Sequence, residues 1–346
     1  MDDLRTIASK LINAKNILLF PHVGIDGDAV GSCVALAKAL RVMGKRVYAL
    51  YKDELPGNLE FMVTDRQGEP YFTDDPDIIS DGELDVSMAV DCGGWDRFRP
   101  YEDKFRAAKA TIVVDHHGTS VITEKDGTTH SIADMAVIEP DASACGLLIF
   151  DLIKEMQAVA EVRILPDREI GEALFAAITT DTGNFQYSNT NKKCFEVMAE
   201  LADWGVDFNR VSVLIYENER LEEVRIRSRA MDNLELISGG RGAVSYVTGD
   251  DLREIGVREG ETDSIVKVMR AIGGVEIVAF LKEKDHDVVR VSYRSKSFAD
   301  VSKMAESHSG GGHKKAAGCT LYMPIIDAVE LIKKEIEEFL ATQAEA

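Results

Sequence analysis

Residues 16–44 read NILLFPHVGIDGDAVGSCVALAKALRVMG, and this stretch decides the fold. The apolar run at 16–21 has the length of a buried strand, and the residues from 28 to 44 have the spacing of a helix. A loop that contains glycine and aspartate joins them. A short buried strand that leads directly into a helix is the first step of a βαβ unit. The stretch therefore predicts a parallel sheet with crossover helices.

The pattern repeats along the first half of the chain. Three further apolar runs read as buried parallel strands: RVYALY at 46–51, VSMAV at 86–90 and TIVV at 111–114. Helices are predicted over 141–157, with Asp141 or Ser143 as the cap, and over 166–181. We therefore expect an α/β fold whose N-terminal domain is a doubly wound, mainly parallel sheet with helices on both faces.

The second half has a different pattern. Residues 216–237 are highly charged and contain few helix breakers, so we interpret them as a helix that links two domains. Strands over 275–283 and 287–294 share a KDHD hairpin, which indicates a mixed sheet, and a last helix is predicted over 325–341. The expected organisation is a catalytic domain over 1–215, a helical linker over 216–237, and a smaller C-terminal α/β domain with a mixed sheet over 238–346.

Composition excludes several classes of protein. The 346 residues carry a net charge of −20, which disfavours a broad groove for duplex DNA. No run approaches the ~18–20 apolar residues that a membrane span needs, and the first ten residues lack a secretory pattern. The five cysteines form no CxxC pair, so a thiolate zinc site or a disulfide framework is not expected. These features predict a cytoplasmic protein.

Acidic and histidine side chains cluster where predicted strands and a helix end. Each has an ordinary explanation as a cap or a loop residue, but parallel strands bring their carboxyl ends to one ligand-binding edge. Two divalent cations would offset the repulsion among four gathered carboxylates, and a two-metal site serves displacement at phosphorus. Mixed oxygen and imidazole ligands suit Mn²⁺, with Mg²⁺, Co²⁺ or Zn²⁺ as alternatives. The residues are His22, Asp26, Asp28, Asp91, Asp115, His116, His117 and Asp181.

Adjacent histidines point in different directions, so at most one of His116 and His117 is expected to bind a given metal. Asp115 could accept a hydrogen bond from a ligand histidine.

A second group of residues has a different character. Between Arg290 and Lys315, six basic and two acidic residues give a local charge of +4. The glycines at 310–312 would let backbone N–H groups approach a phosphate, and His313 and Lys314 would add donors. A solvated glycine-rich turn is the alternative.

At these motifs the sequence resembles the DHH phosphoesterase family, and within it the branch of nanoRNases and pAp phosphatases. The resemblance covers nearly the whole chain and includes HVGIDGD, VDCGG, the DHH triplet at 115–117, TTDTGNF, RSK and GGGHKKAAG in that order. There are two departures: Gly24 and Ile25 stand where the family usually has a pair such as Asn-Pro, and Ser309 takes the place of a first glycine.

The resemblance implies specific roles. It implies metal ligation by His22, Asp26, Asp28, Asp91, His116 and Asp181. His117 would face the scissile phosphate, and with Asp115 it is the expected catalytic pair. The other end of the substrate is expected to contact Arg294, Ser295, Gly311, Gly312, His313 and Lys314.

The expected activity is metal-dependent hydrolysis of short single-stranded oligoribonucleotides and of 3′-phosphoadenosine-5′-phosphate (pAp), with the C-terminal domain holding the substrate across a cleft. Three alternatives remain. They are a phosphodiesterase for linear or cyclic dinucleotides such as pApA, a single-strand-specific exonuclease, and a metal-stabilised binding protein without turnover. No membrane or duplex DNA partner is expected, and a homodimer is compatible with the sequence.

Overall fold

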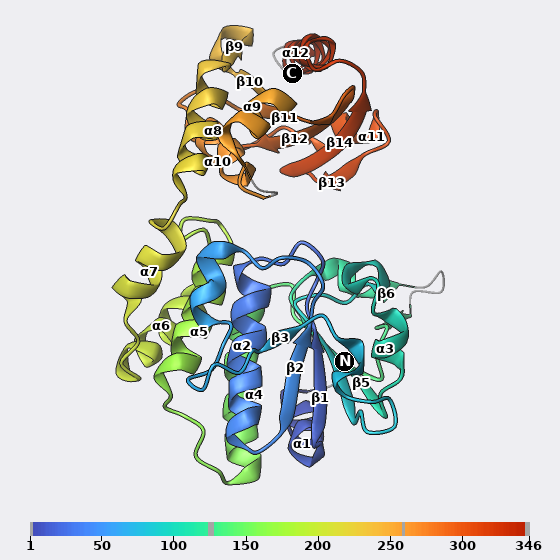
Figure 1. The fold of residues 1–346 in the computed structure, drawn as a ribbon, viewed down its shortest axis with the longest axis vertical. Helices are drawn as coiled ribbons and strands as arrows, with labels where there is room; N and C mark the ends of the chain where they lie inside the picture. The colour runs from blue at the N-terminus through green and yellow to red at the C-terminus, as the bar shows by residue number, and fades with distance from the viewer. Residues whose placement is uncertain (1–2, 124–127, 258–259, 343–346) are drawn as a thin grey trace. The chain divides into compact units, whose positions relative to one another are not determined.

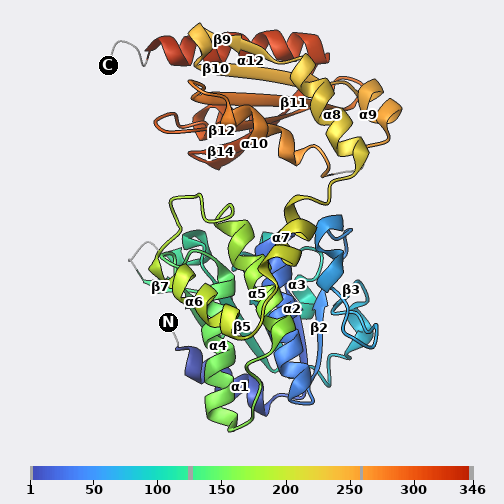
Figure 2. The ribbon, with the colours of Figure 1, turned by 90° about the vertical axis from the view of Figure 1, so that its left-hand side faces the viewer.

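The computed structural model describes residues 3–123, 128–257 and 260–342, which form two compact units (Figures 1 and 2). The first unit extends to Asn218 and the second begins at Glu219. A six-stranded parallel sheet in the order β3-β2-β1-β4-β5-β8 forms the centre of the first unit. Its strands are β1 (Asn16–Phe20), β2 (Arg46–Leu50), β3 (Phe72–Thr73), β4 (Val86–Val90), β5 (Ala110–Asp115) and β8 (Met135–Ile138).

Helices and one small strand pair complete the first unit. The helices are α1 (Leu4–Asn13), α2 (Gly27–Val42), α3 (Glu102–Arg106), α4 (Cys145–Ala160), α5 (Arg168–Asp181), α6 (Lys192–Asp203) and α7 (Phe208–Tyr216). The antiparallel pair consists of β6 (Ile122–Thr123) and β7 (Thr129–His130).

Both faces of this sheet are covered, because alternate side chains of each strand point to opposite sides. Ile17 and Leu19 of β1 belong to one apolar core, and α1, α2, α4 and α5 pack on that face. Leu18 and Phe20 belong to a second core on the other face, where α3 packs (Figure 1). The predicted doubly wound parallel sheet is confirmed.

Two glycines allow helices α2 and α5 to lie against each other. A Cβ atom at Gly31 would lie 2.4 Å from the carbonyl oxygen of Ala173, and one at Gly27 would lie 2.4 Å from the hydroxyl of Thr180. No larger residue fits these contacts without moving a helix. The first turn of α2 therefore lies beside the last turn of α5, which ends at Asp181.

The second unit contains a mixed sheet, as predicted, in the order β13-β14-β12-β11-β10-β9. Only the pair of β10 and β11 is parallel. Its strands are β9 (Glu235–Ile237), β10 (Gly242–Val247), β11 (Ile277–Asp285), β12 (Val288–Ser295), β13 (Gly311–His313) and β14 (Ala316–Tyr322). Its helices are α8 (Leu221–Asp232), α9 (Gly249–Ile255), α10 (Asp263–Ala271), α11 (Ser302–Glu306) and α12 (Ile325–Thr342).

The segment expected to be one linking helix differs in the structure. Residues 216–237 contain the end of α7, the helix α8 and the strand β9. Ile226 and Ala230 of α8 are fully buried in an apolar core with residues of β10 and β11. The many charges in this segment concealed these two buried positions. Residues 238–241 form the turn between β9 and β10, where Gly239 and Gly240 have positive φ angles.

The five cysteines are free and buried. Among the described residues, no helix combines the length and the apolar character that crossing a bilayer would require.

Candidate metal centre

The predicted cluster lies at the carboxyl edge of the first sheet. From the central strand β1 the chain adds β2 and β3 on one side, and β4, β5 and β8 on the other. The change of direction lies between β1 and β4, and ligands bind at such a point in open α/β sheets. His22 follows β1 closely, Asp91 follows β4 directly, and His116 follows β5 directly.

The first group in the cluster consists of His22, Asp26 and Asp91. The Nδ1 atom of His22 lies 3.0 Å from the carbonyl oxygen of Val23, which assigns the Nδ1 proton to that hydrogen bond. Its Nε2 atom lies 3.6 Å from a carboxylate oxygen of Asp26 and 3.6 Å from Oδ2 of Asp91. Three ligand atoms therefore face one another.

The second group has the same design. His116 Nδ1 lies 3.0 Å from the carbonyl oxygen of Ala142, so its Nε2 atom faces the carboxylates. That atom lies 3.7 Å from Oδ2 of Asp28, 3.4 Å from Oδ1 of Asp91 and 3.8 Å from Oδ2 of Asp181. Two histidines from different strand ends are thus oriented alike by backbone carbonyls, which is the usual arrangement around metal-binding imidazoles.

Asp91 faces both groups. Its Oδ2 atom points to His22 and its Oδ1 atom points to His116. Oδ1 of Asp91 and Nε2 of His116 are buried, and no described residue forms a hydrogen bond with either. Unpaired buried polar atoms are costly, and bound cations would satisfy both. The residues present therefore fit two divalent cations with a shared carboxylate.

The shifted pKa values of three residues in the cluster support this fit. Burial opposes protonation of His22, yet Asp26 and Asp91 raise its pKa to about 10. Burial likewise opposes protonation of His116, but Asp91 and Asp28 raise its pKa to about 10. Burial and the charge of Asp91 raise the pKa of Asp181 to about 6, although His116 lowers it. Positive charge is therefore favoured at this edge.

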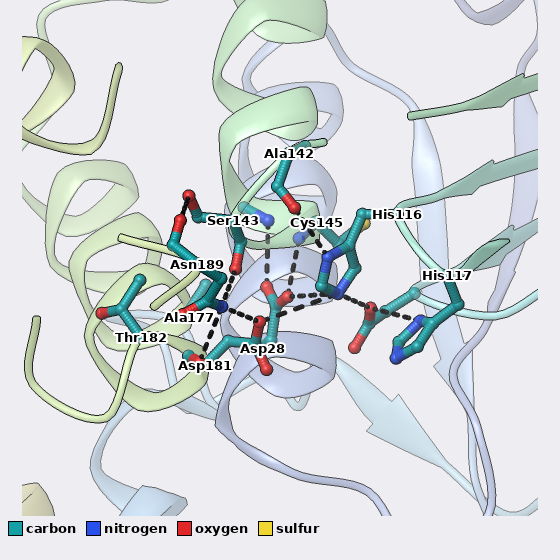
Figure 3. A network of polar contacts seen from close by, with 12 residues as sticks. Asp28, His116, His117, Ala142, Ser143, Cys145, Ala177, Asp181, Thr182 and Asn189 are labelled. Atoms are coloured by element: carbon teal, nitrogen blue, oxygen red, sulfur yellow. Dashed lines mark hydrogen bonds and ion pairs between the residues drawn. The ribbon is translucent and has the colours of Figure 1, made fainter. Parts of the chain in front are cut away.

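Asp28 joins the cluster of acidic and histidine side chains to a helix. Its side chain is 1% exposed. Its two oxygens accept hydrogen bonds from the backbone N–H groups of Cys145 (2.6 Å) and Gly146 (2.9 Å), in the first turn of α4. Figure 3 shows this carboxylate between α4 and the imidazole of His116. A helix N-terminus stabilises negative charge.

This contact corrects the expected cap of α4. The helix begins at Cys145, and its N-cap residue is Ala144, whose side chain cannot form a capping hydrogen bond. Neither Asp141 nor Ser143 caps it, because the carboxylate of Asp28 takes that place. At the start of α2 the cap is Asp26, which accepts hydrogen bonds from two backbone N–H groups at 3.1 Å and still faces His22.

Asp115 organises the turn that carries the two histidines. Its Oδ1 atom accepts hydrogen bonds from the backbone N–H of His116 (2.7 Å), the backbone N–H of His117 (3.1 Å) and the Nδ1 of His117 (2.8 Å). Ser120 donates to its other oxygen. Asp115 is fully buried, and its hydrogen bond raises the pKa of His117. The histidine side chain that Asp115 contacts is His117 and not His116. Asp115 therefore positions the half-exposed imidazole of His117.

Sequence reasoning missed Asn189. Its side-chain amide donates to the carbonyl oxygen of Ser143 (3.0 Å) and to the carbonyl oxygen and Oδ2 atom of Asp181 (3.2 and 3.3 Å) (Figure 3). Three consecutive residues, 183–185, have left-handed φ angles of 56–63° and turn the chain back. The glycine after α5 and the polar SNT segment at 188–190 were the signals that could have identified this support.

In the second unit, the structure places Arg294 and His313 on the two strands that flank β14. Both residues are paired with Ala316, so they occupy the same level and the same face of the sheet. Gly311, Gly312, His313 and Lys314 are exposed. Gly312 has a φ of 143°, and a Cβ atom there would lie 2.5 Å from the carbonyl oxygen of Ala316.

Ser295 differs from its neighbours in this motif. It is 1% exposed, and its hydroxyl donates to the carbonyl oxygens of Ala299 (2.8 Å) and Lys314 (3.3 Å). Its side chain therefore connects two loops of the protein.

Comparisons with known proteins agree with this architecture. Bifunctional oligoribonuclease and PAP phosphatase NrnA from Thermus thermophilus is 26% identical over 331 residues, which cover 94% of this chain and 90% of that protein. The protein of the same name from Bacillus subtilis is 24% identical over 88% of this chain and 89% of its own length. The crystal structure of an exopolyphosphatase-related protein from Bacteroides fragilis matches with a TM-score of 0.84 at 22% identity, covering 97% of this chain and 96% of that one.

Family matches cover most of the chain. Residues 16–178 match the DHH family, N-terminal domain, and residues 239–342 match the DHHA1 domain. The first match contains the ends of β1, β4 and β5, and the second contains the RSK and GGGH motifs. The predicted resemblance is confirmed: the chain contains a DHH-family N-terminal domain followed by a DHHA1 domain.

Proposed function

We propose that this protein is a metal-dependent phosphoesterase that hydrolyses short oligoribonucleotides and removes the 3′-phosphate of pAp. The observation that carries the proposal is the buried Asp91, whose two oxygens face two separate groups of histidine and aspartate ligands. The names and activities of the relatives from T. thermophilus and B. subtilis support the substrate class.

The ligands are His22, Asp26 and Asp91 for one cation, and Asp28, His116, Asp181 and Asp91 for the other. Two divalent cations bound there, which for this ligand set we take to be Mn²⁺, would supply an activated water and Lewis acidity for displacement at phosphorus. The backbone carbonyls behind His22 and His116 accept hydrogen bonds from Nδ1, which leaves their Nε2 atoms as the ones that would bind the cations.

In this proposal His117 is the general acid. Because its Nδ1 proton is held by Asp115, its Nε2 atom is the one available to a phosphate oxygen. The carboxylate of Asp115 raises the pKa of His117 and so favours its imidazolium form. It stabilises charge on the phosphate and donates a proton to the departing oxygen.

The second unit binds the other end of the substrate. Arg294 and His313 on one face, with Lys314 and the exposed N–H groups of Gly311 and Gly312, suit a terminal phosphate. A small basic group in a chain of net charge −20 suits short substrates rather than long polymers. We also propose a cytoplasmic location, supported by five free cysteines.

The deciding experiment is turnover of pAp and of a labelled diribonucleotide by chelated protein, before and after addition of Mn²⁺. We expect metal-dependent release of phosphate from pAp and of mononucleotides from the dinucleotide, with rates that fall as the RNA lengthens. Faster degradation of a long single strand would favour an exonuclease, and a strong preference for pApA would favour a dinucleotide phosphodiesterase. Metal binding without turnover of any of these would contradict the proposal.

Substrate binding by the second unit and hydrolysis at the metal centre can be tested separately. A charge-assisted hydrogen bond contributes roughly 1.5–3 kcal/mol, so Arg294→Ala and His313→Ala should each lower kcat/KM for pAp by about 10- to 150-fold. Bound metal should be unchanged. Arg290→Ala is the matched control, because Arg290 lies on the same face of β12 four residues away. Equal losses on a substrate with a single phosphoester would show that Arg294 and His313 do not capture a second phosphate.

A further inference from the structure

A turn at the end of β12 folds around one buried carboxylate. Glu276 is 6% exposed. Its Oε1 atom accepts hydrogen bonds from the backbone N–H groups of Ser297 (3.0 Å), Phe298 (2.8 Å) and Ala299 (2.8 Å). Its Oε2 atom accepts from the backbone N–H (3.0 Å) and the hydroxyl (2.6 Å) of Ser297. Three consecutive N–H groups thus converge on one ionised side chain, as in backbone anion nests.

The turn is also fixed on its other side. The hydroxyl of Ser295 and the ammonium of Lys315 both donate to the carbonyl oxygen of Ala299, and Lys315 also donates to that of Ser297. The backbone N–H of Ser295 donates to the carbonyl oxygen of Lys315 (3.1 Å). The turn is therefore attached to the segment that carries His313 and Lys314.

This rigid turn displays an aromatic ring. Phe298 is 55% exposed and belongs to neither apolar core of the second unit. Two basic residues precede it in sequence, Arg294 by four positions and Lys296 by two, and the ammonium of Lys315 donates to the carbonyl oxygen of Ser297. Isolated exposed apolar residues are common on proteins. Phe298 differs from these because a buried charged residue forms three backbone hydrogen bonds to hold its turn.

Single-stranded nucleic acid is bound by cationic groups that contact phosphates together with aromatic rings that stack on bases. Resting on the proposed function, we propose that Phe298 stacks on a nucleobase of the substrate and that Glu276 is the residue that positions it. Stacking tolerates every base because each has a π-face. This contact therefore gives selectivity for nucleotides over other phosphoesters, with little preference among bases.

The direct test measures binding without turnover. With metal chelated, Phe298→Trp should show fluorescence quenching when pAp or AMP is added, beyond the signal of wild-type protein, which contains two tryptophans. Ribose 5-phosphate, which lacks a base, should cause no quenching. Absence of quenching by both nucleotides in a variant that still turns over pAp would overturn the inference and leave the proposed function standing. Quenching by the nucleotides in a protein that does not turn over pAp would support base stacking by this ring and contradict the proposed function.

A kinetic test uses a matched control. Phe298→Leu should raise KM for a diribonucleotide by about 5- to 150-fold, the range for loss of one base–aromatic stack, with kcat little changed. KM for ribose 3,5-bisphosphate should not change. Tyr322→Leu should have no effect, because Tyr322 is an exposed aromatic residue six positions along β14 from Ala316, about 20 Å at ~3.3 Å per residue. Equal effects of the two leucine variants would refute the assignment.

The role of Glu276 is tested by combination. Glu276→Gln places an amide N–H₂ group among N–H donors, so it should raise KM for the dinucleotide alone. Added to Phe298→Leu, it should cause no further increase, because both changes remove the same contact. A full additional loss in the double variant would show that Glu276 acts through something other than Phe298. If Glu276→Gln lowers the melting temperature, the Phe298 variants still decide the proposal.

Discussion

Asp91→Asn removes the carboxylate charge that faces both groups of the metal centre while keeping the shape of the side chain. A cation present at about 100 times its Kd stabilises the folded state by about 2.7 kcal/mol, and two such cations by about 5.4 kcal/mol. For a unit the size of residues 1–218, each kcal/mol raises the melting temperature by about 2–4 °C. Metal should therefore raise the Tm of the first unit by about 11–22 °C in the wild-type protein.

In Asp91→Asn the same addition should have little effect. Loss of a second-shell partner weakens metal binding by about 10- to 100-fold, and loss of a shared anionic ligand should weaken it at least as much. At 100-fold weaker binding, the residual stabilisation is about 0.4 kcal/mol for each ion, and the Tm rises by only about 2–3 °C.

Differential scanning calorimetry of chelated and Mn²⁺-loaded samples measures this difference. Asp96→Asn is the control, because Asp96 is an exposed carboxylate in the short 3₁₀ helix Trp95–Phe98, five residues after Asp91. It should behave like the wild type. The shared-carboxylate arrangement is refuted if Asp91→Asn gains as many degrees as the control, or if metal does not stabilise the wild-type protein.

The remaining predictions concern protons and substrate capture. Asp115→Asn should lower the pKa of His117 toward its ordinary value of 6.5, because the hydrogen bond to Asp115 raises it, so the limb of the pH–rate profile that reports the acid should move to lower pH. Because the pKa values of His22 and His116 are about 10 without metal, metal binding at pH 7–8 should release protons and strengthen as pH rises; calorimetry in buffers of different ionisation enthalpy measures both effects. Protonation of His22 and His116 also stabilises the folded protein without metal. This contribution is complete below pH 6.5 and is lost as the pH rises through about 10, so the Tm of chelated protein should fall between these two pH values.

Sequence patterns predicted the strands whose residues are buried along nearly their whole length. The strands at 16–20, 86–90 and 110–115 are buried on both faces, so they appear as unbroken apolar runs, and all three were found. β3 is two residues long and β8 is four, which is too short to form a pattern that stands out from loops. Their formation depends on pairing with neighbouring strands, which is information that a local window does not contain.

The residues of the site also fall into two classes, those placed by the sheet topology and those placed by local turns. Residues that follow strands lie together at one edge of the sheet because parallel topology alone brings them there. Partners that depend on local turns of the backbone were missed. Asn189 reaches Asp181 only because residues 183–185 turn the chain back, and Glu276 organises its turn from the residue just before β11, far away in sequence. The metal and the substrate contacts themselves stay predictions, with the experiments above as their tests.

The position of Asp28 at the start of α4 has an evolutionary consequence. A descendant of this protein that abandoned catalysis and kept only a binding role would be free to lose most of the acidic cluster. It would still need an acceptor at position 28, because the N–H groups of Cys145 and Gly146 are buried and have this carboxylate as their partner. Asparagine caps helices about as well as aspartate and lacks the charge. Asn at this position, together with changes at Asp91, would therefore mark an inactive lineage whose fold is intact.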